Sequence, residues 1–191
     1  MNPPLPSPAQ RRRNRVWLLA IVAVFLLPIL AALVINRSGQ RPAPTRQHGE
    51  LLQPPQDLGA VAPRLADGAD YPWNPQARLW RIVVTPPAAC DVACASLAAD
   101  LDLVWRLLGH NADRVHVLWA GPWPSTAGTP ATLHLLQPDP RLHAALPRND
   151  AGAAGPPVYV IDPNGFVILR YPPGFDPAGL RSDLARLVKL K

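Results

Sequence analysis

The feature that most constrains the fold is a strand–helix–strand pattern with two cysteines at its first turn. Residues 79–85, Leu-Trp-Arg-Ile-Val-Val-Thr, form an apolar and β-branched run that is typical of a buried strand. Residues 114–120 form a second such run. Between them, residues 89–108 repeat apolar side chains at the three-and-four spacing of a one-sided helix. The pattern predicts a βαβ unit whose strand-to-helix turn holds Cys90 and Cys94, the only cysteines in the sequence.

Two further strands and a helix are predicted in the second half of the chain. Residues 158–161 and 166–171 are apolar runs joined by Asp-Pro-Asn-Gly, which predicts an antiparallel hairpin. Asp176 followed by proline predicts the start of a last helix, with a buried face formed by Leu180, Leu184, Leu187 and Val188. The stretch 131–147 is ambiguous between a short strand or turn and a short helix. The element order is β-α-β, an irregular crossover and then β-β-α.

An apolar run near the N-terminus predicts a membrane-spanning helix. Residues 16–35 are long enough as a helix to cross about 30 Å of hydrocarbon. Arginines are more frequent before this run than after it, which predicts a cytoplasmic N-terminus and an exported remainder. A cleaved signal peptide is the alternative. Its apolar region would normally be about 7–15 residues long and end at a small-residue cleavage site, which residues 33–37 do not provide.

The span divides the chain into regions of different composition. The residues that follow it are rich in proline, which is typical of a semi-rigid linker. Within that linker, His48-Gly-Glu-Leu-Leu is more specific than a tether requires, and Leu51 and Leu52 are candidates to dock on the folded domain as an edge segment. The expected regions are a cytoplasmic tail at 1–15, a transmembrane helix at 16–35, a linker at 36–75 and a folded α/β domain at 76–191.

The charge of the chain does not favour a nucleic-acid partner. The formal net charge is +6, but four of the basic residues are the arginines that precede the span. The region after residue 35 holds fifteen basic and thirteen acidic residues, a net charge of +2. No basic patch of the kind that binds nucleic acid is left once the anchor is set aside.

Cys90 and Cys94 are placed to act together. Four residues apart on one helix, they face the same side, with their Cα atoms about 6 Å apart. That separation suits a disulfide, and it also suits two thiolates on one soft metal ion such as Cu(I). A helix N-terminus lowers the pKa of a thiol, whereas the neighbouring Asp91 opposes that effect. A passive structural disulfide and a pair of buried free thiols remain as alternatives.

The order of elements resembles the thioredoxin fold. Pro157 falls where thioredoxin-like proteins keep a cis-proline that faces the cysteine pair. Thioredoxins have two residues between their cysteines, whereas this chain has three. With its single anchor, its Asp-Pro-Asn-Gly hairpin and its His48-Gly-Glu-Leu-Leu segment, the chain more narrowly resembles the Sco family of cytochrome c oxidase copper-delivery proteins, over about residues 47–190.

This resemblance implies a role for the cysteines, but the sequence lacks the residue that would be the third copper ligand. By resemblance, Cys90 and Cys94 are copper ligands or catalytic redox thiols. Sco proteins usually have proline just after the first cysteine, where this chain has Asp91. They also have a copper-ligand histidine a few residues before the hairpin, at a position that falls on Ala154. Because residues 149–157 contain no histidine, the third ligand does not carry over.

The other histidines are the candidate replacements. His134 and His143 lie in the ambiguous crossover and are the plausible third ligands, while His48 would reach the domain only if its segment packs there. His116 alternates within a predicted strand, and His110 follows a helix end and is expected to be solvated. No serine–histidine–acid spacing, phosphate loop or paired-carboxylate motif supports a hydrolase or a nucleotide-binding protein.

The leading hypothesis is an anchored, thioredoxin-like assembly factor on the periplasmic side of a bacterial inner membrane. It would handle copper, as Cu(I), or reduce cysteines during maturation of a respiratory oxidase, with an oxidase subunit or another assembly factor as its partner. Thiols in that compartment tend to be oxidised. One alternative is a non-catalytic interaction module that has lost metal binding, motivated by Ala154. Another is a general periplasmic thiol–disulfide oxidoreductase, which the three-residue spacing disfavours.

Overall fold

The computed structural model describes residues 8–37, 47–90, 92–130, 132–152 and 154–189. The chain divides into two compact units, Met1–Thr45 and Arg46–Lys191. The first unit contains one long helix, α1 (Pro8–Arg37), in which Gln10–Ala31 is long and apolar enough to cross a membrane. Residues 16–35, the predicted span, lie within α1.

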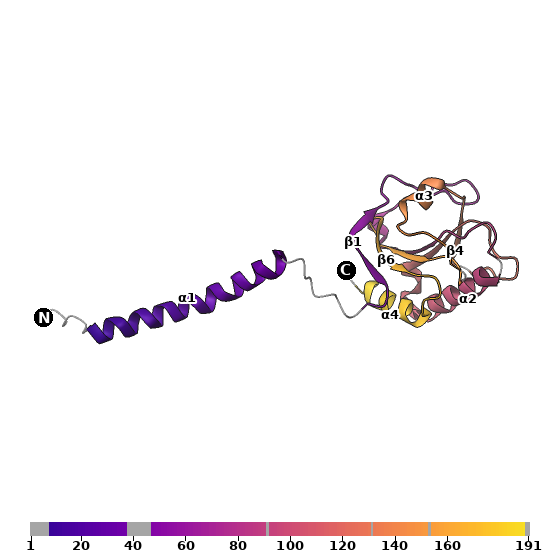
Figure 1. The fold of residues 1–191 in the computed structure, drawn as a ribbon. Helices are drawn as coiled ribbons and strands as arrows, with labels where there is room; N and C mark the ends of the chain where they lie inside the picture. The colour runs from indigo at the N-terminus through magenta and orange to yellow at the C-terminus, as the bar shows by residue number, and fades with distance from the viewer. Residues whose placement is uncertain (1–7, 38–46, 91, 131, 153, 190–191) are drawn as a thin grey trace. The chain divides into compact units, whose positions relative to one another are not determined.

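The second unit is built on one six-stranded sheet (Figure 1). The strand order is β1-β6-β5-β2-β3-β4, with β2 parallel to β3, β3 parallel to β4, and the remaining neighbours antiparallel. The strands are β1 (Glu50–Asp57), β2 (Trp80–Val84), β3 (Val115–Ala120), β4 (Leu133–Leu136), β5 (Val158–Ile161) and β6 (Phe166–Tyr171). The helices are α2 (Val92–Arg106), α3 (Pro140–Ala145) and α4 (Pro177–Leu187), with short 3₁₀ turns at Pro75–Ala77 and Gly109–Arg114.

The predicted βαβ unit and hairpin are both present. The five residues of β2 are all buried, because helices or loops cover both faces of the sheet. In the hairpin between β5 and β6, a carboxylate oxygen of Asp162 accepts hydrogen bonds from the amides of Asn164 and Phe166, at 2.9 and 2.8 Å. Gly165 has a φ of +94°, which a side chain would disfavour, so the Asn-Gly pair suits this turn.

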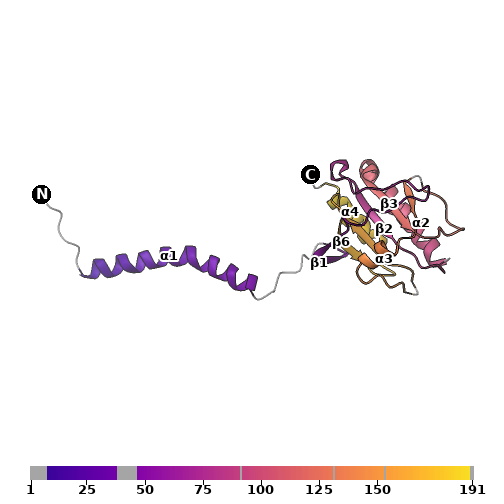
Figure 2. The same ribbon diagram turned by 90° about the horizontal axis from the view of Figure 1, so that it is seen from above.

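Alternate residues of the central strands enter two separate cores. Ile82 and Val84 pack with α2 and α4 on one face, whereas Val83 packs on the other face with Leu142 of α3 and with residues from 58–73. Figure 1 shows α2 and α4 together on one side of the sheet and α3 on the opposite side, and Figure 2 shows the same unit from above. Because successive side chains of a strand point to opposite faces of the sheet, the apolar run of β2 contributes to both cores.

The edge strand β1 lies within residues 36–75, which we predicted to be a linker because they are rich in proline. β1 pairs with β6, and its register shifts between Leu51 and Gln56, where Pro54 and Pro55 lie. Proline lacks an amide donor, so it is tolerated at a sheet edge and at a bulge. The second compact unit accordingly extends from Arg46, thirty residues before the boundary that composition suggested.

Candidate functional site

The two cysteines form a disulfide at the carboxyl end of the central strand β2. Their Cα atoms are 5.4 Å apart, inside the usual range for such bonds. Cys94 lies in the first turn of α2 and is fully buried in the core, whereas Cys90 is half-buried. The sequence suggested a helix from about residue 89, but α2 begins at Val92, so Cys90 precedes it. Of the two bonded cysteines, Cys90 is therefore the one that another molecule can reach.

A groove of about 270 Å³ runs beside the start of α2. Its helix wall includes Ala93, Ser96 and Asp100, and its other wall comes from the loops before β5 and α4, with Ala154, Pro156 and Phe175 among its residues. Gly155 lies so close to the helix that a Cβ atom there would be 3.6 Å from the Cβ of Ala93.

The loop before β5 thus lies against the start of α2. The resemblance placed a cis-proline at Pro157 in this loop, and the structure differs from that expectation. Pro157 itself is buried, and its neighbour Pro156 lines the groove. Within the described residues, the cis peptide bond is the one before Pro54, so the bond before Pro157 is trans.

The position expected for a third copper ligand lies in this groove and is occupied by Ala154. The described part of the chain brings no three His, Cys, Asp or Glu side chains together as a metal site. His143 lines a different cleft, of about 400 Å³, with Thr85 and Pro86 at the carboxyl ends of the strands, and His134 lies at their amino ends. The donor set in this oxidised form therefore does not fit a three-ligand copper site.

His134 belongs instead to a cluster that sequence reasoning missed, formed with Tyr71, Arg81 and His116. The rings of His116 and His134 stack with their centroids 4.4 Å apart, and Nδ1 of His116 is 2.8 Å from the hydroxyl of Tyr71. Burial, and then the charges of His134 and Arg81, lower the pKa of His116 to about 4. Burial likewise lowers the pKa of His134. Both rings are neutral at pH 7.

Arg81 gives this histidine cluster a buried positive charge. Its side chain is 1 % exposed, and Nη1 donates to the carbonyl oxygens of Leu79, Asp162 and Pro163 at 3.0 to 3.2 Å. The guanidinium carbon lies 5.4 Å from the centroid of Trp73, a cation–π distance. Because a fixed cation lies beside the two rings, the cluster is better suited to structure than to binding another cation.

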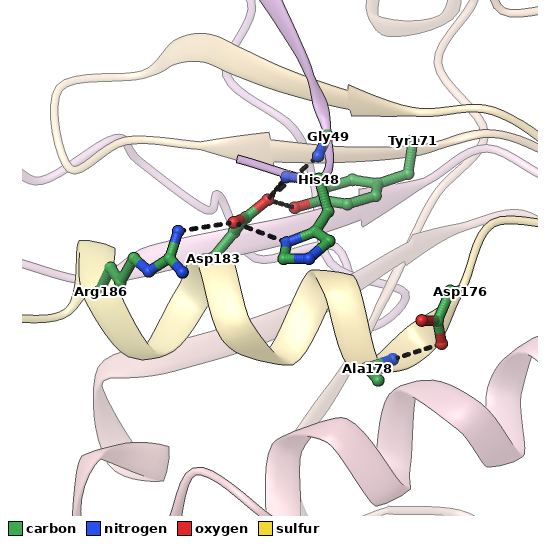
Figure 3. A network of polar contacts seen from close by, with 7 residues as sticks. All are labelled: His48, Gly49, Tyr171, Asp176, Ala178, Asp183 and Arg186. Atoms are coloured by element: carbon green, nitrogen blue, oxygen red, sulfur yellow. Dashed lines mark hydrogen bonds and ion pairs between the residues drawn. The ribbon is translucent and has the colours of Figure 1, made fainter. Parts of the chain in front are cut away.

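A second polar network joins the start of the compact unit to its last helix (Figure 3). The carboxylate of Asp183 in α4 is 3 % exposed, and one of its oxygens accepts from the amides of His48 and Gly49 at 2.7 and 3.0 Å. The same oxygen accepts from the Tyr171 hydroxyl at 2.7 Å. Its other oxygen lies 3.3 Å from Nδ1 of His48 and 3.8 Å from Nη1 of Arg186.

The electrostatics of this network follow from burial and hydrogen bonding together. Burial alone would raise the pKa of Asp183, but the amides of Gly49 and His48 and the hydroxyl of Tyr171 outweigh it and lower that pKa below its usual range. Burial and the neighbouring carboxylate raise the pKa of Tyr171. His48 therefore contacts Asp183 through both its amide and its ring. The unusual His-Gly-Glu sequence in a proline-rich stretch was the signal for this contact.

A sheet of this topology, with a cysteine pair at the junction of a central strand and the helix that follows it, defines a thioredoxin-like protein. The chain belongs to the family described as "Transmembrane-like, thioredoxin-like, C-terminal domain", whose family model matches residues 80–191. A search of curated protein sequences finds no match.

Solved structures with similar folds include several Sco proteins. Yeast Sco1 with copper bound matches with a TM-score of 0.52 and 13% identity, over 68% of this chain and 90% of that one. A SCO1/SenC family lipoprotein from Bacillus anthracis matches with a TM-score of 0.51 and 14% identity, over 72% and 99%. Trgpx in its apo form matches with a TM-score of 0.52 and 14% identity, over 70% and 95%. At these identities the likeness concerns the fold, and the predicted thioredoxin-like fold is confirmed.

Proposed function

We propose that the chain is a membrane-anchored thiol–disulfide protein that exchanges its Cys90–Cys94 disulfide with cysteines of a respiratory oxidase subunit or another assembly factor. The observation that carries this proposal is the asymmetry of the pair. Cys90 is half-buried and Cys94 is fully buried, at the end of a central strand. A purely structural bridge does not require one reachable and one protected sulfur, whereas stepwise exchange uses both.

The exchange would proceed through a mixed disulfide. A substrate thiolate attacks the sulfur of Cys90, the bond to Cys94 breaks, and Cys94 leaves as a thiolate that takes up a proton. A second substrate thiolate then attacks the first substrate sulfur and releases Cys90. The substrate dithiol becomes a disulfide and the chain gains two electrons and two protons. The reverse sequence reduces a substrate disulfide.

The proposed process rests on the resemblance to Sco proteins, and the proposed location rests on the apolar helix α1. The motifs shared with the Sco family support oxidase assembly as the process. The arginines before the apolar helix support a single-pass protein of a bacterial inner membrane, with its thioredoxin-like unit in the periplasm. Copper transfer is not part of the proposed step, because two sulfurs and Ala154 do not complete the ligand set that Sco proteins use.

A redox titration tests the proposal. The full-length chain in detergent micelles is equilibrated with thiol–disulfide buffers, quenched with acid and alkylated, and the alkylated thiols are counted by mass. We expect a reversible two-electron transition with a midpoint above roughly −300 mV, because structural disulfides generally lie below that value. A midpoint well below it would assign Cys90–Cys94 to a passive bridge and favour the interaction-module alternative.

Two single-cysteine variants provide a matched pair. Cys94→Ser leaves the reachable thiol and should form a mixed disulfide readily with an aromatic disulfide reagent. Cys90→Ser leaves the buried thiol and should react at least about tenfold more slowly, because access limits thiol exchange. Equal rates for the two variants would contradict the assigned roles.

A further inference from the structure

The groove beside the start of α2 contains one carboxylate that has no partner among the described residues. Asp100 lies on the wall formed by α2, and within the described residues it makes no hydrogen bond or ion pair. The next acid on the same helix, Asp102, pairs with Arg106 one turn away. Burial raises the pKa of Asp100, and no other cause contributes. The carboxylate is thus partly buried without a donor among the described residues, and a ligand that supplies a donor would be favoured there.

The remainder of the groove is uncharged. Leu97, Pro156 and Phe175 are apolar, Ala93 and Ala154 are small, and Ser96 adds a hydroxyl. Small residues beside the helix leave room for a backbone to approach, and apolar walls suit side chains of an extended segment. A ligand that fills this groove meets a neutral surface with a single negative charge at one point.

The distance from that charge to the disulfide sets a spacing. Asp100 is six residues beyond Cys94, and a helix rises about 1.5 Å per residue, so the two positions are about 9 Å apart along α2. An extended chain advances about 3.3 Å per residue. The sulfur of Cys90 is bonded to that of Cys94, so the same distance applies approximately to the reacting sulfur. About three residues of an extended segment therefore separate a cysteine that reacts at Cys90 from a side chain that reaches Asp100.

We propose that this groove binds an extended segment of the substrate protein that carries a lysine or arginine about three residues from its reacting cysteine, and that Asp100 pairs with that basic side chain. This inference rests on the exchange proposed above. The same carboxylate repels glutathione, which has two carboxylates and a net negative charge, so the site selects polypeptides over that small thiol. Asp100 is a specificity residue and takes no part in moving electrons or protons between sulfurs.

The test compares three cysteine peptides that differ at one position. Each has a single cysteine with lysine, norleucine or glutamate three residues away, and a second set places that residue on the other side of the cysteine. The oxidised full-length chain in detergent micelles is mixed with each peptide thiol, and the mixed disulfide is quantified by mass after acid quenching. We expect the lysine peptide to react about fivefold faster than the norleucine peptide in one of the two sets, and the glutamate peptide to be slowest.

Two variants separate Asp100 from the general charge of the helix. Asp100→Asn keeps the shape of the side chain and should abolish the lysine preference while leaving the norleucine rate unchanged. Asp102→Asn removes one negative charge from the same helix outside this groove and should preserve the preference. A preference that survives Asp100→Asn, or that both variants lose equally, would overturn the assignment. Equal rates for the three peptides would refute the groove proposal alone, whereas no reaction with any peptide would also refute the exchange.

Discussion

Removing the carboxylate of Asp183 is the sharpest test of how the compact unit is held together. The structure predicts that Asp183→Ala releases the segment at His48 and Gly49 from α4. It removes one oxygen that accepts three hydrogen bonds, from the His48 and Gly49 amides and from the hydroxyl of Tyr171, and a second oxygen that lies 3.3 Å from the ring of His48. Tyr171 is 1 % exposed, so its hydroxyl would remain buried without that partner.

The magnitude follows from the burial of the group. A donor left without its partner in a buried place costs about 1–3 kcal/mol, so losing the acceptor of three donors should cost about 3–5 kcal/mol of unfolding free energy. Tyr171→Phe removes one of the three donors and should cost about 1–2 kcal/mol. Asp176→Ala, on the same helix, removes only the N-cap that accepts from the amide of Ala178 at 2.9 Å, and should cost about 1 kcal/mol. The three losses should rank in that order.

Urea unfolding of the full-length chain in detergent micelles, followed by tryptophan fluorescence, measures these losses. With an m-value of roughly 2 kcal/mol/M, Asp183→Ala should lower the midpoint by about 1.5–2.5 M. The pKa of Asp183 is lowered by folding, so its stabilising effect is present above the unfolded pKa of about 3.9 and is lost as the pH falls below it. If Asp183→Ala lost less than about 1 kcal/mol of unfolding free energy, or no more than Asp176→Ala, the claim that this network stabilises the fold would be refuted.

Four further predictions address the core, the histidine cluster, the copper question and the membrane topology. Leu101→Asp places a charge in the core, where the residue is 2 % exposed, and should cost several kcal/mol, whereas Leu103→Asp on the exposed side of α2 should cost less than about 0.5 kcal/mol in the same urea assay. The lowered pKa of His116 should make the chain lose about 1–2 kcal/mol as the pH falls from 6.5 to about 4, after allowance for partial exposure, and His116→Gln should flatten that part of the pH profile. The reduced chain should bind Cu(II) poorly in a chelator competition, and Ala154→His should tighten Cu(II) binding, while unchanged binding would show that position 154 does not face the thiols. Alkaline phosphatase fused after Lys191 should be active, and an inactive fusion beside a fluorescent cytoplasmic one would reverse the assigned topology.

The elements that sequence predicted well are those whose pattern is local. The runs at β2, β3, β5 and β6 are short, apolar and bounded by turn residues, and the helix period of α2 and α4 is complete within each segment. The Asp162–Gly165 turn needs only its own four residues to form. The cysteines lie close together, with their Cα atoms 5.4 Å apart, as their spacing suggested, although Cys90 precedes α2 instead of lying in it.

The features that sequence missed depend on contacts between distant residues. β1 shows no alternation because most of its side chains are exposed, and its prolines are tolerated only because it lies at a sheet edge. Tyr71, His116 and His134 come from three separate segments, so no periodicity connects them. The contact between His48 and Asp183 spans 135 positions. Asp100 was hidden because its lack of a partner becomes visible only when both walls of the groove are in place.

The pairing of β1 with β6 sets an order of events during synthesis. Glu50 lies opposite Arg170, so the first strand to be made waits for a partner that follows 120 positions later. At about 5–20 residues per second, that delay is roughly 6–24 s. During this interval β1 is a strand without a neighbour, and its two prolines and charged ends hinder pairing with another chain. The prolines and acidic residues that made β1 hard to predict from the sequence thus hinder aggregation of the nascent chain until its C-terminal part has been made.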